Sequence, residues 1–187
     1  MRKLHKINTD LARTALAAFT ELFEGEDWFD PEKHHGFSIA LLPVDGKVDI
    51  VSVGEFSIDG RKKLTQEIAE EKANRAMTHF CKHQTLSSFH GRDPSAMKYG
   101  GGLHYASQHN EGFLNSFALA VSGLTEAMDE TVSLVLTQLH LPESKILTYY
   151  QNFIKRDSVF REGLITDAQV LRDTNFLIER VSIPQIA

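Results

Sequence analysis

The chain has 187 residues, of which 42% are hydrophobic, and a formal net charge of −5 at pH 7. This is enough chain for one domain with its own core and an appendage. The acidic balance, with no basic run longer than Arg61-Lys62-Lys63, argues against a nucleic-acid partner. The single cysteine, Cys81, excludes an internal disulfide, and the charged Asp10 and Glu21 do not fit a signal peptide. We therefore expect a cytoplasmic protein with no membrane partner.

An amphipathic helix is expected near the amino terminus. Asn8 or Thr9 can accept hydrogen bonds from its first amides, and Gly25 supplies a stop. Its apolar face consists of Leu11, Ala15, Leu16, Phe19, Leu22 and Phe23. A loop follows, in which we expect the adjacent histidines His34 and His35 to be solvated.

A strand hairpin and a second helix come next. The apolar runs 37–42 and 48–53 flank Asp45-Gly46, a dipeptide typical of tight hairpin turns. Asp59 is the expected cap of the helix that follows. The predicted apolar face of this helix is Leu64, Ile68, Ala69, Ala73, Ala76, Met77 and Phe80. Its predicted solvated face is Glu67, Glu70, Glu71 and Lys72.

Two histidines lie near the end of this helix. The spacing of His79 and His83 puts both imidazoles on one helix face, a separation that a transition metal or a haem environment can use. No third ligand can be assigned from spacing, so the metal ligands stay unassigned. The alternative is a solvated or capping role, since histidine is favourable at a helix carboxyl end.

A glycine stretch precedes the next strand. Tyr99 is followed by three glycines, Gly100 to Gly102, which indicates a close backbone approach either to a neighbouring helix or to a ligand. The Lys-Ser/Thr ending of a phosphate loop is missing. Residues 107–112 then permit a hairpin turn into an apolar strand that stops at Ser122-Gly123.

The most clearly patterned helix begins after this strand. Thr125 is its expected cap, and Glu126, Asp129 and Glu130 lie in opening turns where the helix dipole favours negative charge. Its apolar face is Met128, Val132, Val135, Leu136 and Leu139. Ser122, Gly123 and the first amides after Thr125 make a candidate anion site; the competing expectation is that Thr125 and Glu126 satisfy these donors.

The carboxy-terminal part predicts further helical structure. A helix starting at Pro142 has an apolar row of Ile146, Leu147, Tyr150, Phe153 and Ile154, which could supply one side of a homo-oligomer interface. Thr166 with Gln169 is a capping-box pattern for a short helix ending near Leu171. Residues 176–183 are expected to form a strand or an extended tail.

The order of these elements resembles the GlcG/HbpS-like family, also called the haem-degrading domain family. The resemblance covers Thr9 to Leu139, and its best-matching segments are 68–76, 100–105 and 119–135. It implies an α+β fold, a profilin-like antiparallel sheet flanked by helices in the order α-β-β-α-β-β-α. It also implies a domain over residues 1–140 and assembly into homo-oligomers. Residues 141–187 lie outside the resemblance, and we expect them to form an extension packed on that domain or on a partner subunit. Some members of this family bind haem and most have no established reaction.

Two functions of different classes follow. The first is a small-ligand binding protein, with haem as the cofactor expected from the resemblance and His104 as the first residue to test. His104 follows the glycines on a strand whose alternation sends Leu103 and Tyr105 to the opposite face. The predicted site comprises His104, His79, His83, Tyr99, Gly101, Gly102, Ser122, Gly123 and Thr125.

The second function is a non-enzymatic scaffold or protein–protein interaction module that uses the fold for assembly. A binding role is favoured over an enzymatic one. A Ser-His-Asp hydrolase is a distant third, because Ser122 lacks the Gly-x-Ser-x-Gly elbow.

Overall fold

The computed structural model of this chain describes residues 6–44, 46–83, 88, 91–109, 112–141, 146–156 and 167–182. Its strands are β1 (Gly36–Pro43), β2 (Asp49–Gly54), β3 (Gly102–His109) and β4 (Gly112–Ser122). Its helices are α1 (Thr9–Phe23), α2 (Pro31–His34), α3 (Arg61–His83), α4 (Glu126–His140), α5 (Ile146–Arg156) and α6 (Asp167–Ser182), with a 3-10 turn η1 (Pro94–Ala96).

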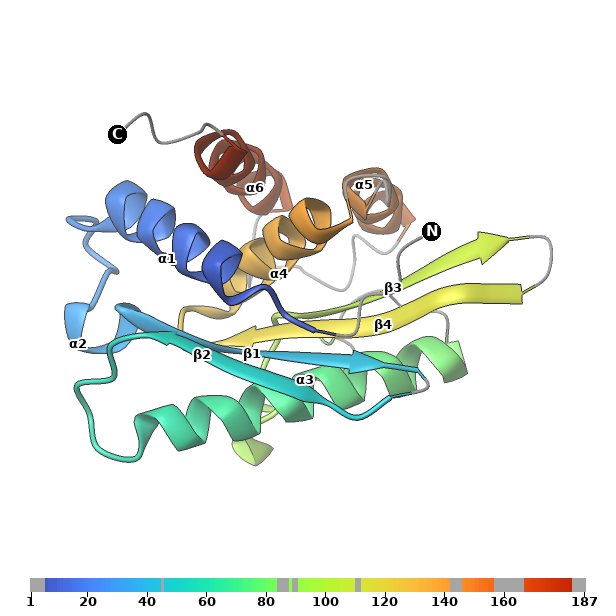
Figure 1. Cartoon of the computed structure of the whole chain (residues 1–187), viewed down its shortest axis with the longest axis horizontal. Coiled ribbons are helices and arrows are strands. Elements are labelled where there is room, and N and C mark those ends of the chain that lie inside the picture. The colour runs from blue at the N-terminus through green and yellow to red at the C-terminus, as the bar shows by residue number, and fades with distance from the viewer. Residues whose placement is uncertain are drawn as a thin grey trace.

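The strands form one antiparallel sheet in the order β2-β1-β4-β3, with helices on both faces. Figure 1 shows α3 on one face and α1 and α4 on the other, with α5 and α6 on the same side as α1 and α4. The expected α+β class and the order α-β-β-α-β-β-α are therefore confirmed, with the one-turn α2 as an addition. The outer strands β2 and β3 form the two edges of the sheet.

Strand alternation gives the sheet two unlike faces. The main core joins strand residues Phe37, Ile39, Leu41, Leu103, Tyr105, Phe117, Leu119 and Val121 to residues of α1 and α4. The other face is lined by alanines: Ala40, Ala118 and Ala120 pack with Ala69, Ala73 and Ala76 of α3. Small side chains on both surfaces let α3 lie close to the strands.

The first helix follows the sequence prediction, but the loop after it does not. Asn8 caps α1 by accepting hydrogen bonds from the amides of Asp10 and Leu11. His34, expected to be solvated, is instead buried against the rings of Trp28 and Phe29. Its Nδ1 accepts a hydrogen bond from the Asp30 amide at 2.8 Å, and burial lowers its pKa. The one-turn helix α2 turns this imidazole inward.

The solvated face predicted for α3 is wrong at one position. Lys72 is 1% exposed, although Glu67 is exposed as expected and Glu70 is half-buried. Thr65, Ala69 and Lys72 share a helix face and are all buried against the sheet. The carboxylate that makes this burial possible comes from α4 and is described below.

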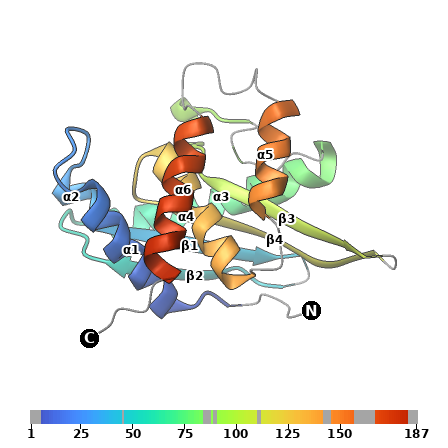
Figure 2. The same ribbon diagram turned by 90° about the horizontal axis from the view of Figure 1, so that it is seen from above.

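The carboxy-terminal segment packs on its own chain. Figure 2 shows α6 beside α1 and α4. Helix α6 continues to Ser182, so the predicted short helix and the predicted strand or tail over 176–183 are both wrong for the residues described. Val170, Thr174 and Leu177 are buried at helical spacing, and this periodicity decides the local structure. Thr166 lies outside the described residues.

The apolar row on α5 is used inside the molecule. Ile146 and Tyr150 are fully buried in the main core, so they are not available to a partner subunit as predicted. The side chain of Phe153 and the residue Pro142 are outside the described part.

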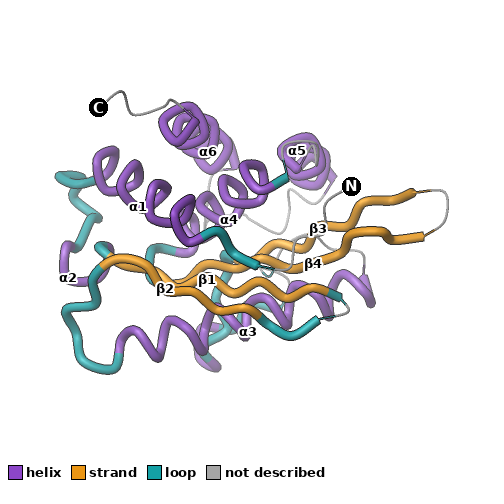
Figure 3. Tube along the Cα trace, in the orientation of Figure 1, coloured by secondary structure: helices purple, strands orange, loops and turns teal. Residues whose placement is uncertain are grey.

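The hairpin of β3 and β4 is longer than predicted. The expected turn over 107–112 is wrong at its ends, because β3 runs to His109 and β4 begins at Gly112. Figure 3 shows the two strands projecting together beyond the helices.

Candidate functional site

Six of the predicted site residues lie together where β3 begins and β4 ends. The Val121 amide donates to the Gly101 carbonyl at 3.3 Å, and Gly102 is opposite Ala120 in the sheet register. This brings Gly101 and Gly102 beside Ser122, Gly123 and the start of α4. We call residues 99–102 with 121–125 the glycine junction.

A buried ion pair lies at the centre of the glycine junction. Lys72 Nζ donates to Asp129 Oδ2 at 2.6 Å and to the Val121 carbonyl at 2.9 Å. Asp129 Oδ1 also accepts from the Leu124 amide at 3.0 Å. Burial raises the pKa of Asp129, and the charge and hydrogen bond of Lys72 oppose that rise. Because α3 and α4 cover opposite faces of the sheet, this pair joins the two helical layers.

Two glycines of the stretch before β3 lie closely against helices. Gly101 has φ +109°, and a Cβ there would lie 2.5 Å from Asp129 Cβ and 3.2 Å from Lys72 Nζ. A Cβ on Gly102 would lie 3.0 Å from the Lys72 carbonyl oxygen. Of the two alternatives for the glycine stretch, close packing against helices is the one found at these two residues.

Further polar groups hold the backbone of the same stretch. Arg75 donates to the carbonyls of Ser88 and Tyr99, and its Nε pairs with Glu71 at 2.8 Å. Ser88 Oγ accepts from the Gly102 amide at 2.8 Å. Ser133 Oγ donates to the Gly101 carbonyl at 2.8 Å.

The start of α4 is occupied by groups of the chain itself. Thr125 caps the helix by accepting from the Met128 amide at 3.4 Å, as predicted. Glu126 turns away from the helix to pair with Arg92 at 2.7 Å and to accept from the Gly100 amide at 2.8 Å. Burial pushes the pKa of Glu126 upward, but Arg92 and the Gly100 amide outweigh this effect and hold it below its usual value.

These contacts bear on the predicted anion site. The Leu124 and Met128 amides, two of the donors an anion would use, are bonded to Asp129 and Thr125. The carboxylates of Glu126 and Asp129 beside them disfavour a second negative charge. The competing expectation is therefore found for Thr125, whereas Asp129 bonds the Leu124 amide in place of the expected Glu126.

His104 lies one layer away, on the α3 face of β3. As predicted, Leu103 and Tyr105 point to the opposite face. The imidazole stacks on Phe80 with ring centroids 3.6 Å apart, and Nε2 is 2.8 Å from Ser116 Oγ. Nδ1 is buried with no hydrogen-bond partner, and burial lowers the pKa of His104 to about 3. The imidazole is therefore neutral at pH 7.

A haem iron could not bind His104 Nε2 without displacing Ser116, whereas Nδ1 is the ring nitrogen left without a partner. Phe80 covers one face of the ring. His79 lies next to Gly91, whose added Cβ would be 2.9 Å from His79 Nε2. The side chain of His83 is outside the described part. Within the described residues, no three His, Cys, Asp or Glu side chains are grouped to hold a metal ion.

Sequence reasoning missed the charged residues that build the glycine junction. Lys72, Arg75 and Arg92 were not among the predicted site residues, and Asp129 was assigned only a dipole role. One signal existed for Lys72, which lies three residues from Ala69 and four from Ala76 on the small-residue face of α3. Nothing in the sequence indicated that Arg92 meets Glu126.

Comparison with family models, with curated proteins and with solved structures found no match to this chain. The resemblance to the GlcG/HbpS-like family therefore stays a prediction. No helix in the part of the chain that the structure describes is long and apolar enough to cross a membrane.

Proposed function

We propose that this protein is an interaction module that binds another polypeptide by adding a strand to the outer edge of β2. This develops the scaffold alternative drawn from the sequence. The observation that carries it is the hydrogen-bonding pattern of β2, which directs backbone groups of Ile50 and Ser52 away from the sheet.

The direction of these groups follows from the ladder between β1 and β2. The Glu55 amide donates to the His35 carbonyl at 2.9 Å, so residues 35 and 55 form a hydrogen-bonded pair. Such pairs alternate along an antiparallel ladder, and the register then assigns Val51 and Val53 to bonds with β1. Ile50 and Ser52 must direct their N–H and C=O groups outward.

The two edges of the sheet differ in what meets these outward groups. At β3, the Ser88 amide donates to the Gly102 carbonyl at 2.7 Å, and Ser88 Oγ accepts from the Gly102 amide. The β3 register also shifts between Ser107 and Gln108, which interrupts that edge. At β2, no backbone hydrogen bond from another described segment reaches Ile50 or Ser52.

The side chains of β2 suit strand addition. The inner residues Ile50, Val51, Ser52 and Val53 include no charge and no proline, the two devices that commonly protect an edge. In strand addition, main-chain hydrogen bonds supply affinity and alternate side chains supply selectivity.

The test is a proline substitution with a matched control. Ile50→Pro removes an outward N–H without removing a bond to β1. Ile50→Thr also replaces the isoleucine side chain but keeps the N–H. Peptides selected from a random library on the whole protein are titrated into the parent and both variants while amide shifts are recorded. We expect extended peptides to perturb the Ile50 and Ser52 amides, to bind Ile50→Thr, and to fail with Ile50→Pro. Equal binding to Ile50→Pro would contradict the proposal.

A second candidate function is the small-ligand site predicted at His104. The observation that favours it is the buried Nδ1 with no hydrogen-bond partner. Haem is the probe, titrated into the parent and into His104→Ala while the Soret band is recorded. A band in the parent that His104→Ala loses would support this site, and a parent with no haem spectrum would remove it.

A further inference from the structure

We infer that the strand added to β2 is β2 of a second copy of this chain, paired antiparallel about a two-fold axis that passes beside Val51. This inference rests on the proposed function and names its partner. The two sheets would join edge to edge, and a two-fold axis perpendicular to the sheet would place α3 of both copies on the same face.

The backbone of β2 is self-complementary in this register. With Val51 opposite Val51 of the second copy, Ile50 lies opposite Ser52 and Ser52 opposite Ile50. These are the residues whose N–H and C=O groups point outward, so both pairs can exchange two hydrogen bonds.

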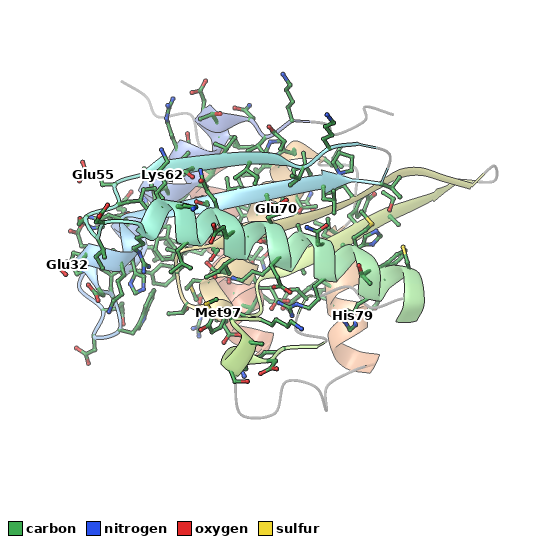
Figure 4. The ribbon with its side chains drawn as sticks, turned by 90° about the horizontal axis from the view of Figure 1, so that it is seen from below. Glu32, Glu55, Lys62, Glu70, His79 and Met97 are labelled. Carbon is green, nitrogen blue, oxygen red and sulfur yellow. The ribbon has the colours of Figure 1, made fainter. Side chains whose placement is uncertain are left out.

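Charges at the two ends of β2 select the same register. Lys47 and Glu55 are both exposed, one before β2 and the other after it. With Val51 on the axis, each Lys47 lies opposite Glu55 of the second copy, which gives two symmetric opposite-charge pairs. Figure 4 shows Glu55 at the outer margin of the molecule, far from His79 near the end of α3.

Neighbouring registers that keep outward groups paired lose this match. A shift that puts Ser52 on the axis brings Glu55 opposite Asp49, which is a like-charge pair. A shift that puts Ile50 on the axis brings Lys47 opposite Val53. Charge complementarity and backbone pairing therefore agree on Val51, and both act across the edge that the described chain leaves open.

Charge reversal tests the pairing. The molar mass of the parent is measured by sedimentation equilibrium across micromolar concentrations, beside Lys47→Glu, Glu55→Lys and the double variant. We expect a parent dimer, about tenfold weaker association in each single variant because two attractive pairs become repulsive, and recovery in the double variant. Glu26→Lys, an exposed site in the loop after α1, is the control with the same charge change and should match the parent. Single variants that associate as tightly as the parent would overturn the register.

A cysteine at the axis tests the register independently. In a Cys81→Ser background, Val51→Cys should form an intermolecular disulfide, because facing residues of a non-hydrogen-bonded pair have Cα atoms about 4.5 Å apart. Ile50→Cys and Ser52→Cys should cross-link more slowly.

The outcomes separate the two proposals. A monomeric parent at all concentrations that still binds selected peptides at Ile50 and Ser52 would overturn the second-copy inference and keep the proposed function. A monomer that binds no peptide at β2 would overturn both.

Discussion

The two edges of the sheet are built in opposite ways. The β3 edge is closed at Gly102 by both the amide and the hydroxyl of Ser88, and Arg75 holds the Ser88 carbonyl. From Ile50 to Val53 the β2 edge carries uncharged residues, and no described segment meets its outward backbone groups. A buried arginine thus helps to fix the β3 edge, whereas the β2 edge is open among the described residues.

The contrast has an energetic basis. A buried ion is tolerated only when a partner and further hydrogen bonds replace the water it loses. Lys72 and Asp129 meet this condition at the glycine junction, where they also bind the Val121 carbonyl and the Leu124 amide. The junction should therefore be sensitive to single substitutions, and the β2 edge should tolerate them.

The largest effect is expected from Lys72→Met, which leaves Asp129 buried beside no cation. Loss of one partner of a buried pair costs about 3–5 kcal/mol of unfolding free energy. Urea denaturation measures it, with Lys63→Met on the exposed side of α3 as the control, expected to change stability by less than about 0.5 kcal/mol. The double variant Lys72→Met with Asp129→Leu should recover part of the loss. A Lys72→Met protein as stable as the Lys63→Met control would contradict the role of this pair.

Gly101→Ala should follow in size. Its φ of +109° disfavours any side chain, and the new Cβ would meet Asp129 Cβ at 2.5 Å. We expect a loss of about 2 kcal/mol or more in denaturant unfolding. Gly60→Ala is the matched control, since Gly60 also has positive φ, +73°, but has nothing within 4 Å of an added Cβ. Its expected loss is about 1 kcal/mol, and equal losses would show that the close contact contributes nothing.

The features predicted correctly from the sequence depend on local patterns. The strand alternation around His104, the caps Asn8 and Thr125, and the apolar face of α4 are local patterns, and all are found. Lys72 lies on the small-residue face of α3, but the partner that permits its burial is 57 positions away on another helix and could not be identified from the sequence. His34 was misplaced for a similar reason, because Trp28 and Phe29 bury it through tertiary packing. Residues 176–182 were predicted as a strand or tail, whereas they continue α6, which packs against α1 and α4.

The buried His104, on the α3 face of the sheet, should make the stability of the protein depend on pH. The folded-state pKa of His104 is about 3, below the 6.5 of the exposed residue. As the pH falls below 6.5, His104 binds a proton in the unfolded chain but stays neutral in the folded protein. It therefore lowers the free energy of unfolding by up to about 1.4 kcal/mol per pH unit. This destabilisation is absent above about pH 6.5 and stops growing near pH 3.

The difference between the parent and His104→Gln isolates that group. His34 and His140 also have lowered pKa values, and they act equally in both proteins. Denaturation at pH 7, 6, 5 and 4 should show His104→Gln less stable at pH 7 and the gap closing as the pH falls. Parallel stability curves would show that His104 takes up a proton in the folded protein.

The smallest effect is expected from Ser88→Ala. This change removes the acceptor of the Gly102 amide and leaves the Ser88 amide bonded to the Gly102 carbonyl. The loss should be about 1 kcal/mol, and exchange of the Gly102 amide should accelerate about fivefold. An unchanged exchange rate would mean that the Ser88 hydroxyl does not protect the β3 edge.

The most direct measurement is hydrogen exchange of the Ile50 and Ser52 amides as the concentration of the protein rises. If β2 pairs with β2 of a second copy, protection at these two amides increases with concentration, the Lys47→Glu variant requires higher concentrations, and the Gly102 amide does not change. Exchange at Ile50 and Ser52 that stays fast and independent of concentration, at levels up to the solubility limit, would contradict pairing of two copies through β2.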